Sequence, residues 1–200
     1  MIKAIFFDLD GTLLNSQKQI PDETRIALQT CKNQGIQLFV ATARPPILDR
    51  MLHWTSKECS LFDGGVYCNG GCERFADKVK YAFVPPPVVL HCIEEVKKYN
   101  GLHIALQMKN EIHAFNHPLA DFAYQPWGIE QSDVVAVTNS CAEQTVKILI
   151  YYENIVDTVT PLPRALTEHV QQYCAARAKC YLTDQGKVLQ IANRTASKYN

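Results

Sequence analysis

Residues 2–13 read I-K-A-I-F-F-D-L-D-G-T-L, and this stretch decides the fold. Ile2 to Phe7 is a short, mainly apolar run with β-branched and aromatic members, typical of a parallel strand that is covered on both faces. The run ends in Asp8-Leu9-Asp10-Gly11-Thr12-Leu13. Two carboxylates and a glycine are therefore predicted to follow the carboxyl end of a buried strand.

A helix and a second strand follow this stretch. The start signal Pro21-Asp22-Glu23 and the stop signal Gly35 enclose a helical pattern, and residues 36–42 indicate a second buried strand. A right-handed β-α-β crossover places both strands in one parallel sheet with their carboxyl ends at the same edge, where open α/β sheets bind ligands. Thr42 is therefore expected beside the acidic pair.

The rest of the chain indicates a second domain. Pro45-Pro46 predicts a helix through about Trp54, and residues 61–68 predict a third strand that turns at Asn69-Gly70-Gly71. Pro85-Pro86-Pro87 is a rigid break, where we place a domain boundary. Two repeats of helix and hairpin follow, with helical spacing over residues 89–96 and 166–174 and hairpins over residues 102–115 and 178–191, and residues 146–152 indicate a further strand.

These patterns predict an α/β protein of two domains. The first is a Rossmann-like core with a parallel sheet, in residues 1–82 and 187–200. The second is an inserted α/β cap domain in residues 83–186, an antiparallel sheet with helices on one face.

Composition excludes several classes of protein. The chain of 200 residues has 20 Lys plus Arg and 20 Asp plus Glu, so no basic excess favours nucleic acid as a partner. Its apolar stretches fall far below the roughly 18 residues that a membrane-spanning helix needs. The apolar run before Asp8 is too short for a secretory signal, so we expect a cytoplasmic protein. Eight scattered cysteines predict reduced, mostly buried thiols, and only Cys68 and Cys72 could meet across a hairpin.

The acidic pair is the candidate chemical centre. Two carboxylates at n and n+2 raise each other's pKa unless a cation offsets their repulsion, and Mg²⁺, which takes oxygen ligands, would do so at Asp8 and Asp10. Asp8 could then attack phosphorus, while Asp10 could act as general acid and base. Gly11 lets the backbone pass close to a phosphate, whose oxygens the loop N–H groups can bind. The alternative is an acidic strand cap without catalysis.

The string D-L-D-G-T-L resembles the first motif of the haloacid dehalogenase superfamily of phosphatases and phosphomutases. Thr42 in V-A-T-A-R resembles the second motif, which implies that its hydroxyl binds the phosphoryl group. Ala43 stands where the most similar subfamily usually has Gly, and Arg44 occupies a basic position that could contact the phosphate. The resemblance implies a phosphate site formed by Leu9, Gly11, Thr42, Ala43, Arg44 and Lys198.

The later motifs resemble the Cof-type subfamily, IIB. Asn69-Gly70 resembles the turn after the third strand and implies a substrate-binding Asn69. The stretch L-Q-I-A-N-R-T-A-S-K resembles the approach to the third motif, with Lys198 as the catalytic lysine and Tyr199 in place of a common Gly. A fourth, acidic motif would lie beyond Lys198. We therefore expect a fragment whose first strand has a bare edge open to self-association and whose Mg²⁺ affinity and activity are impaired.

The predicted function is that of a Mg²⁺-dependent phosphatase. Its substrate would be a small phosphorylated metabolite such as a sugar phosphate, a nucleotide or a cofactor phosphate, hydrolysed through an aspartyl-phosphate on Asp8. One alternative is a phosphosugar mutase, and another is a non-catalytic, truncated relative that binds a ligand or partner. The cap residues that could shape substrate choice are His103, His113, His117, Tyr124 and Trp127. We expect them instead to lie on the surface or to pack in the core of the cap, because the six histidines show no ligand spacing.

Overall fold

The computed structural model describes residues 2–152 and 160–197. These residues form two compact units, each held together mainly by contacts within itself. Unit 1 consists of residues 2–81, 122–129 and 197, and unit 2 consists of residues 82–121, 130–152 and 160–196.

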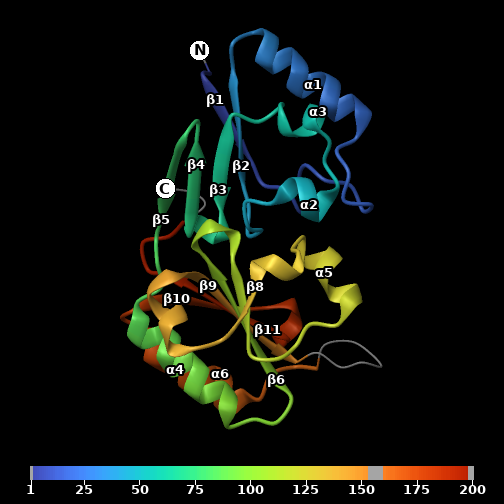
Figure 1. Cartoon of the computed structure of the whole chain (residues 1–200). Coiled ribbons are helices and arrows are strands. Elements are labelled where there is room, and N and C mark those ends of the chain that lie inside the picture. Colours follow the sequence, from blue (N-terminus) through green and yellow to red (C-terminus); the bar gives the residue numbers. More distant parts are fainter. Residues whose placement is uncertain (1, 153–159, 198–200) are drawn as a thin grey trace. The chain divides into compact units, whose positions relative to one another are not determined.

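Unit 1 is built on a five-stranded sheet with the order β1-β2-β3-β4-β5 (Figure 1). Its strands are β1 (Ala4–Phe7), β2 (Gln37–Ala41), β3 (Gly64–Tyr67), β4 (Cys72–Phe75) and β5 (Lys78–Tyr81). The first three strands are parallel, and β3, β4 and β5 are antiparallel. The helices of this unit are α1 (Asp22–Asn33), α2 (Leu48–Leu52), α3 (Ser56–Cys59) and, from its second residue on, α5 (Asp121–Trp127).

The three parallel strands differ in how closely they are packed. β2 lies between two neighbours and buries Leu38 and Val40 completely. A Cβ on Gly65 of β3 would lie 2.7 Å from the backbone oxygen of Val40, so the parallel pairing of β2 with β3 requires glycine there. β1 pairs with β2 at one edge of the described sheet, and Phe6 remains 50% exposed. The prediction of a first strand covered on both faces is therefore wrong, because Ala4 and Phe6, which share one face of β1, are exposed.

Unit 2 is a six-stranded sheet with two long helices packed on it (Figure 1). The strand order is β10-β11-β9-β6-β7-β8, and only the β7–β8 pair is parallel. The strands are β6 (Leu102–Met108), β7 (His113–Phe115), β8 (Val134–Ala136), β9 (Thr145–Tyr152), β10 (Ala178–Thr183) and β11 (Val188–Asn193). The helices are α4 (Pro86–Lys97) and α6 (Arg164–Cys174). Both predicted hairpins are present as β6–β7 and β10–β11.

The core of unit 2 joins its helices to its sheet. Val89 and Cys92 of α4 and Val170 of α6 are fully buried against Ile148 and Ile191 of the central strands. Helix α4 starts at Pro86 after the predicted proline break, because proline is tolerated in the first turn, where its missing N–H has no helical partner.

The division into units differs from the predicted domains near the C-terminus. We predicted that residues 187–200 return to the core, whereas residues 188–193 form β11, which pairs with β9 and β10 inside unit 2. The α/β character predicted for the chain is confirmed.

The cysteine prediction is confirmed. All eight cysteines lie in the described part of the chain as reduced thiols, and five of them, including Cys68 and Cys72, are buried. Among the described residues, no helix combines the length and apolar character needed to cross a bilayer.

Asp63 fixes the register of unit 1 at the end of the sheet where β2 and β3 begin. Its carboxylate accepts a hydrogen bond from the amide of the fully buried Leu38 at 2.9 Å and one from Lys32 Nζ of α1 at 3.0 Å. The Asp63 amide donates to the Leu38 carbonyl at 2.7 Å. Burial acts to raise the pKa of the Asp63 carboxyl, but the Leu38 amide and the Lys32 ammonium outweigh it and hold the pKa below its ordinary 3.8.

Replacing Asp63 should therefore destabilise the fold. Asp63→Ala leaves the buried Leu38 amide without this acceptor and should lower the free energy of unfolding by about 1–3 kcal/mol, whereas Asp63→Asn keeps an amide oxygen and should lose less. Because the folded-state pKa is depressed, the contribution of the charge is present above pH 3.8 and is lost as the pH falls through the folded-state pKa. Urea unfolding at pH 7 and pH 3 measures both effects. Equal stability of the wild type and Asp63→Ala at pH 7 would contradict the assigned role.

Candidate functional site

The acidic loop begins directly after β1. The carbonyl of Leu9 accepts hydrogen bonds from the amides of Thr12, Leu13 and Leu14 at 2.9–3.3 Å, which folds the chain back on itself immediately after the strand. Gly11 has φ of +77°, a left-handed conformation that glycine adopts at little cost. The turn leaves the Leu9 side chain fully buried, Asp8 half-buried and the Asp10 side chain 40% exposed.

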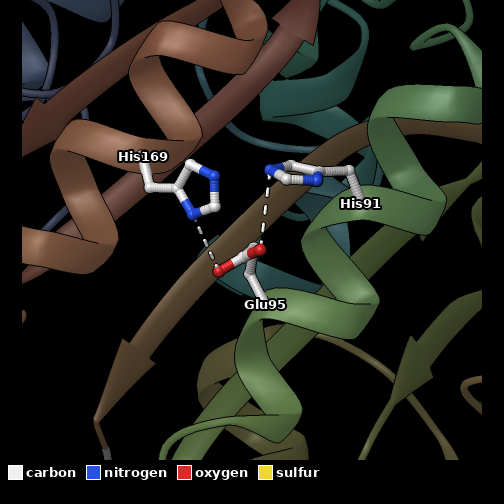
Figure 2. A group of neighbouring side chains, drawn as sticks. All are labelled: His91, Glu95 and His169. Carbon is white, nitrogen blue, oxygen red and sulfur yellow. Dashed lines mark ion pairs between the residues drawn. The ribbon is translucent and has the colours of Figure 1, made fainter.

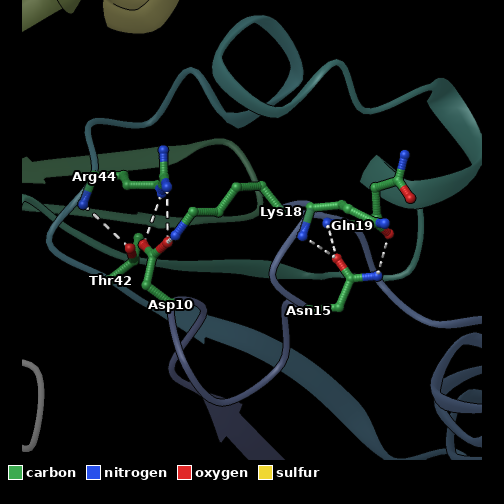
Figure 3. Close-up of polar contacts among 7 residues, drawn as sticks. Asp10, Asn15, Lys18, Gln19, Thr42 and Arg44 are labelled. Carbon is green, nitrogen blue, oxygen red and sulfur yellow. Dashed lines mark hydrogen bonds and ion pairs between the residues drawn. The ribbon is translucent and has the colours of Figure 1, made fainter.

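Two basic side chains meet the carboxylate of Asp10 (Figure 3). Arg44 donates from Nε to Oδ2 and from Nη2 to Oδ1, both at 2.8 Å, in a bidentate pair. Lys18 Nζ approaches Oδ1 at 2.8 Å. The Arg44 hydrogen bonds are the main reason why the pKa of the Asp10 carboxyl falls to about 2, with Lys18 adding to them against the opposing effect of burial. Asp10 is thus ionised at neutral pH in this arrangement.

Thr42 ties the loop after β2 to its neighbours. Its side-chain oxygen accepts a hydrogen bond from the Arg44 amide at 3.1 Å, and its amide donates to the Val66 carbonyl of β3 at 2.8 Å. The Thr42 carbonyl accepts from the Asn69 amide at 3.2 Å, and the Arg44 carbonyl accepts from the Cys68 amide at 2.9 Å. The loops after β2 and β3 are therefore joined by the backbone, and Arg44 is held in place to reach Asp10.

Lys18 is the site residue that sequence reasoning missed. It lies in a turn organised by Asn15, whose Oδ1 accepts from the amides of Gln17 and Gln19 at 3.0 and 2.9 Å (Figure 3). Lys18 itself has φ of +61°, and this turn directs its side chain back to Asp10. The Asn15 turn was a detectable signal in the sequence, because Asn side chains often accept from the amide two residues on. No signal in the sequence indicated that the Lys18 side chain returns to Asp10, eight residues earlier.

The structure brings several predicted site residues together and leaves others open. Hydrogen bonds link Arg44 to the side chains of Asp10 and Thr42, and Asn69 joins them through its amide. Asp8 follows β1, the parallel neighbour of β2, at the same edge of the sheet. Lys198 lies outside the described residues.

Other predicted members can act only through their backbone. The Leu9 side chain is fully buried, Gly11 has no side chain, and Ala43 offers only a methyl group. The side-chain oxygens of Asp8 and Asp10 and the backbone carbonyls of this loop are hard donors, which is the class that Mg²⁺ and Ca²⁺ take.

The chain is similar to known proteins both in sequence and in fold. The model of the haloacid dehalogenase-like hydrolase family matches residues 5–200. Among curated proteins, YkrA of Bacillus subtilis, which is named for a phosphatase activity, is 44% identical over 46 residues, 23% of this chain and 18% of that protein. The 5-amino-6-(5-phospho-D-ribitylamino)uracil phosphatase YcsE of Bacillus subtilis is 42% identical over 43 residues, 22% of this chain and 17% of that protein. The matched segments thus span less than a fifth of these relatives.

Solved structures share the fold over nearly the whole chain. A haloacid dehalogenase-like hydrolase from Bacteroides thetaiotaomicron superposes with a TM-score of 0.72 and 20% identity, covering 99% of this chain and 73% of that one. A sugar phosphatase of subclass IIB has a TM-score of 0.72 and 18% identity, covering 98% and 72% of the two chains. At these identities the likeness concerns the fold. Since the family model covers all but the first four residues, the chain belongs to the haloacid dehalogenase-like hydrolase family.

Proposed function

We propose that this protein hydrolyses a small phosphorylated metabolite, such as a sugar phosphate, a nucleotide or a cofactor phosphate, through an aspartyl-phosphate on Asp8. The observation that carries the proposal is the bidentate Arg44–Asp10 pair at the carboxyl ends of β1 and β2. The pair lies at the edge of the sheet where Asp8 follows β1, and this supports the assignment of Asp8 as the nucleophile and Arg44 as a phosphate ligand. Membership of the hydrolase family supports the same reading.

Each residue has a defined part in the proposed reaction. A carboxylate oxygen of Asp8 forms a bond to phosphorus as the bond to the leaving oxygen breaks. The Asp10 carboxyl gives its proton to that oxygen and later takes one from the water that hydrolyses the phosphoaspartate. The hydroxyl of Thr42, the loop amides near Leu9, Gly11 and Ala43, and Lys198 would bind the phosphoryl oxygens, and Asn69 would contact the substrate.

Arg44 and Lys18 must change partners during this cycle. In the structure both hold the Asp10 carboxylate, where they stabilise its ionised form. A bound phosphate offers the same two cations a more highly charged partner, and guanidinium binds phosphate in the same bidentate manner. We infer that substrate draws Arg44 away from Asp10 and so leaves that carboxyl able to hold a proton.

The oxygen donors of the loop fit a divalent cation. Because the Asp10 carboxylate already accepts three hydrogen bonds, the Asp8 carboxylate and the Asp10 backbone carbonyl are the better ligands. Mg²⁺ takes one or two protein carboxylates and fills its other positions with phosphate and water. When bound, it would offset negative charge on the nucleophile and the transferring phosphoryl group.

Unit 2 is proposed as the cap that selects the substrate. Its described residues, 82–121, 130–152 and 160–196, form a separate α/β unit inserted between the loop of Thr42 and the predicted third-motif lysine. Inserted lids of this kind exclude water before chemistry begins.

Replacing Asp8 should abolish turnover. Asp8→Asn keeps the shape of the side chain but removes the anionic nucleophile, so Mg²⁺-dependent phosphate release from a panel of sugar phosphates, nucleotides and cofactor phosphates should fall by roughly 10³-fold or more. Asp77→Asn, a matched change at an exposed turn of the same unit, should leave it unaltered. Equal turnover by Asp8→Asn and the wild type would refute the mechanism.

Arg44 should contribute to substrate binding in proportion to its two hydrogen bonds. Arg44→Met removes a charge-assisted contact of about 1.5–3 kcal/mol, which corresponds to a loss in kcat/KM of roughly 10- to 100-fold. Arg44→Lys keeps the charge without the planar fork and should fall between the two. Steady-state kinetics on the best substrate of the panel measures all three proteins. An unchanged kcat/KM in Arg44→Met would remove this residue from the site.

The edge strand β1 is proposed to mediate self-association of this chain. β1 is the outermost strand of the described sheet, and an open strand edge is a template for pairing with another chain. Sedimentation should show an average mass that rises with protein concentration, and Phe6→Lys on β1 should reduce the rise. Ile26→Lys on helix α1 of the same unit, where the wild-type side chain is 68% exposed and belongs to no strand, is the control. A single monomeric mass at all concentrations would contradict the proposal.

A further inference from the structure

A second group of potential ligands lies in unit 2, on the helices that cover its sheet. His91 and Glu95 stand one turn apart on α4, and His169 lies on α6, which packs beside α4 (Figure 2). One ligand atom from each of the three residues lies within 4.8 Å of the other two. Spacing along the sequence does not show this group, because the second imidazole comes from α6, far along the chain from α4.

Glu95 is the most deeply buried member of this group. The Glu95 side chain is 5% exposed, although its neighbours on α4 in the core are apolar. Its Oε1 lies 2.6 Å from Lys98 Nζ and 3.9 Å from His91 Nε2, and its Oε2 lies 3.2 Å from His169 Nδ1. A buried carboxylate requires compensation by a positive charge. The Lys98 ammonium alone can neutralise the Glu95 carboxylate. The two imidazoles beside the same carboxylate are therefore not needed for charge compensation.

The His91 ring is held in place and its inner nitrogen is unsatisfied. The ring stacks on Tyr173 of α6, with ring centroids 3.8 Å apart and planes 13° from parallel. Nε2 is buried and has no hydrogen-bond partner among the described residues. Buried polar atoms of this kind usually have a partner, so this nitrogen points to a missing ligand. Burial also lowers the pKa of His91, which favours the neutral imidazole that a metal binds.

The distances suit a transition metal with little rearrangement. Zinc binds imidazole nitrogen and carboxylate oxygen at about 2.0–2.2 Å, so two ligand atoms of one ion stand no more than roughly 4.4 Å apart. The two distances from Glu95 already meet this limit. The third requires only a small rotation of His169, whose side chain is 54% exposed and able to turn.

We propose that His91, Glu95 and His169 bind a divalent transition metal ion that joins α4 to α6. Two nitrogens and one carboxylate favour Zn²⁺ and Co²⁺ over Mg²⁺ and Ca²⁺, which take oxygen. The open side at His169 leaves room for water as a fourth ligand. An ion bound to Oε1 of Glu95 would displace the Lys98 ammonium, which lies 2.6 Å from that oxygen.

Co²⁺ is a direct probe of this site. Titration of Co²⁺ into the metal-free, untagged chain should give the visible absorption of a four- or five-coordinate ion, and Zn²⁺ should displace it and erase the colour. Loss of even an outer-shell partner weakens metal sites by about 10–100-fold, so His169→Gln should weaken Co²⁺ binding at least roughly tenfold. His53→Gln, an exposed histidine of unit 1, is the control and should bind as the wild type does.

Three outcomes would overturn the proposal. They are no visible absorption at millimolar Co²⁺, equal affinity of His169→Gln and the wild type, and equal affinity of a folded His91→Gln and the wild type. Circular dichroism establishes the folding of His91→Gln, whose ring contact with Tyr173 is lost. His169→Gln changes a half-exposed side chain and keeps the test valid if His91→Gln does not fold.

Lys98 supplies a test that chance binding to a surface histidine would not pass. Lys98→Met removes the ammonium that competes for Glu95 and should strengthen Co²⁺ binding severalfold. Lys97→Met makes the same change of charge one residue away, where the lysine pairs with the exposed Glu94, and should leave binding unchanged. Equal affinities of these two variants would show that Glu95 is not a ligand and would overturn the three-residue site.

Discussion

The parallel pairing of β1 with β2 is the constraint on which the candidate site depends. Phe7 lies beside Val40 in the register, so the residues that follow each strand emerge at the same edge. That pairing places the loop of Asp10 within reach of Arg44. β3 extends the arrangement, because Val66 accepts from the Thr42 amide and the turn at Asn69 donates to the Thr42 carbonyl. Three strand ends thus supply one site, and none of its side chains has to cross the sheet.

Charge compensation explains how an acidic pair persists at this edge. Asp8 and Asp10 would repel each other, because only one residue separates them. Arg44 and Lys18 offset this repulsion by binding the Asp10 carboxylate, and neither acidic residue is fully buried. Both cations stand on loops: one follows β2 and the other ends the turn of Asn15. Loops change conformation more easily than strands, so the same two cations can be held on a carboxylate in one state and on a phosphate in another.

Local and non-local features of the chain were predictable to different degrees. The strand and its acidic loop could be predicted because the apolar run and D-L-D-G-T-L are adjacent in sequence. Arg44 could be placed in the site because it follows Thr42 closely in the sequence. The contact of Lys18 with Asp10 depends on the left-handed backbone conformation of Lys18, which its residue type does not predict. β11 belongs to unit 2 through pairing with β9, a register between distant segments. His169 reaches Glu95 only because α6 packs on α4, which periodicity alone does not show.

The two proposed groups of ligands in this chain differ in the chemistry of their donors, and this difference would allow both to bind their ions in one protein. The loop after β1 offers carboxylate and carbonyl oxygens, which suit an ion that keeps its water and binds phosphate. The α4–α6 group offers two imidazoles around one carboxylate, which suits an ion that prefers nitrogen. Affinity for a transition metal at the second group therefore need not remove a hard cation from the first. Lys98 neutralises Glu95 in the structure, and apolar side chains pack α4 and α6 on the sheet, so a metal ion at the second group would bind to helices that other contacts already hold.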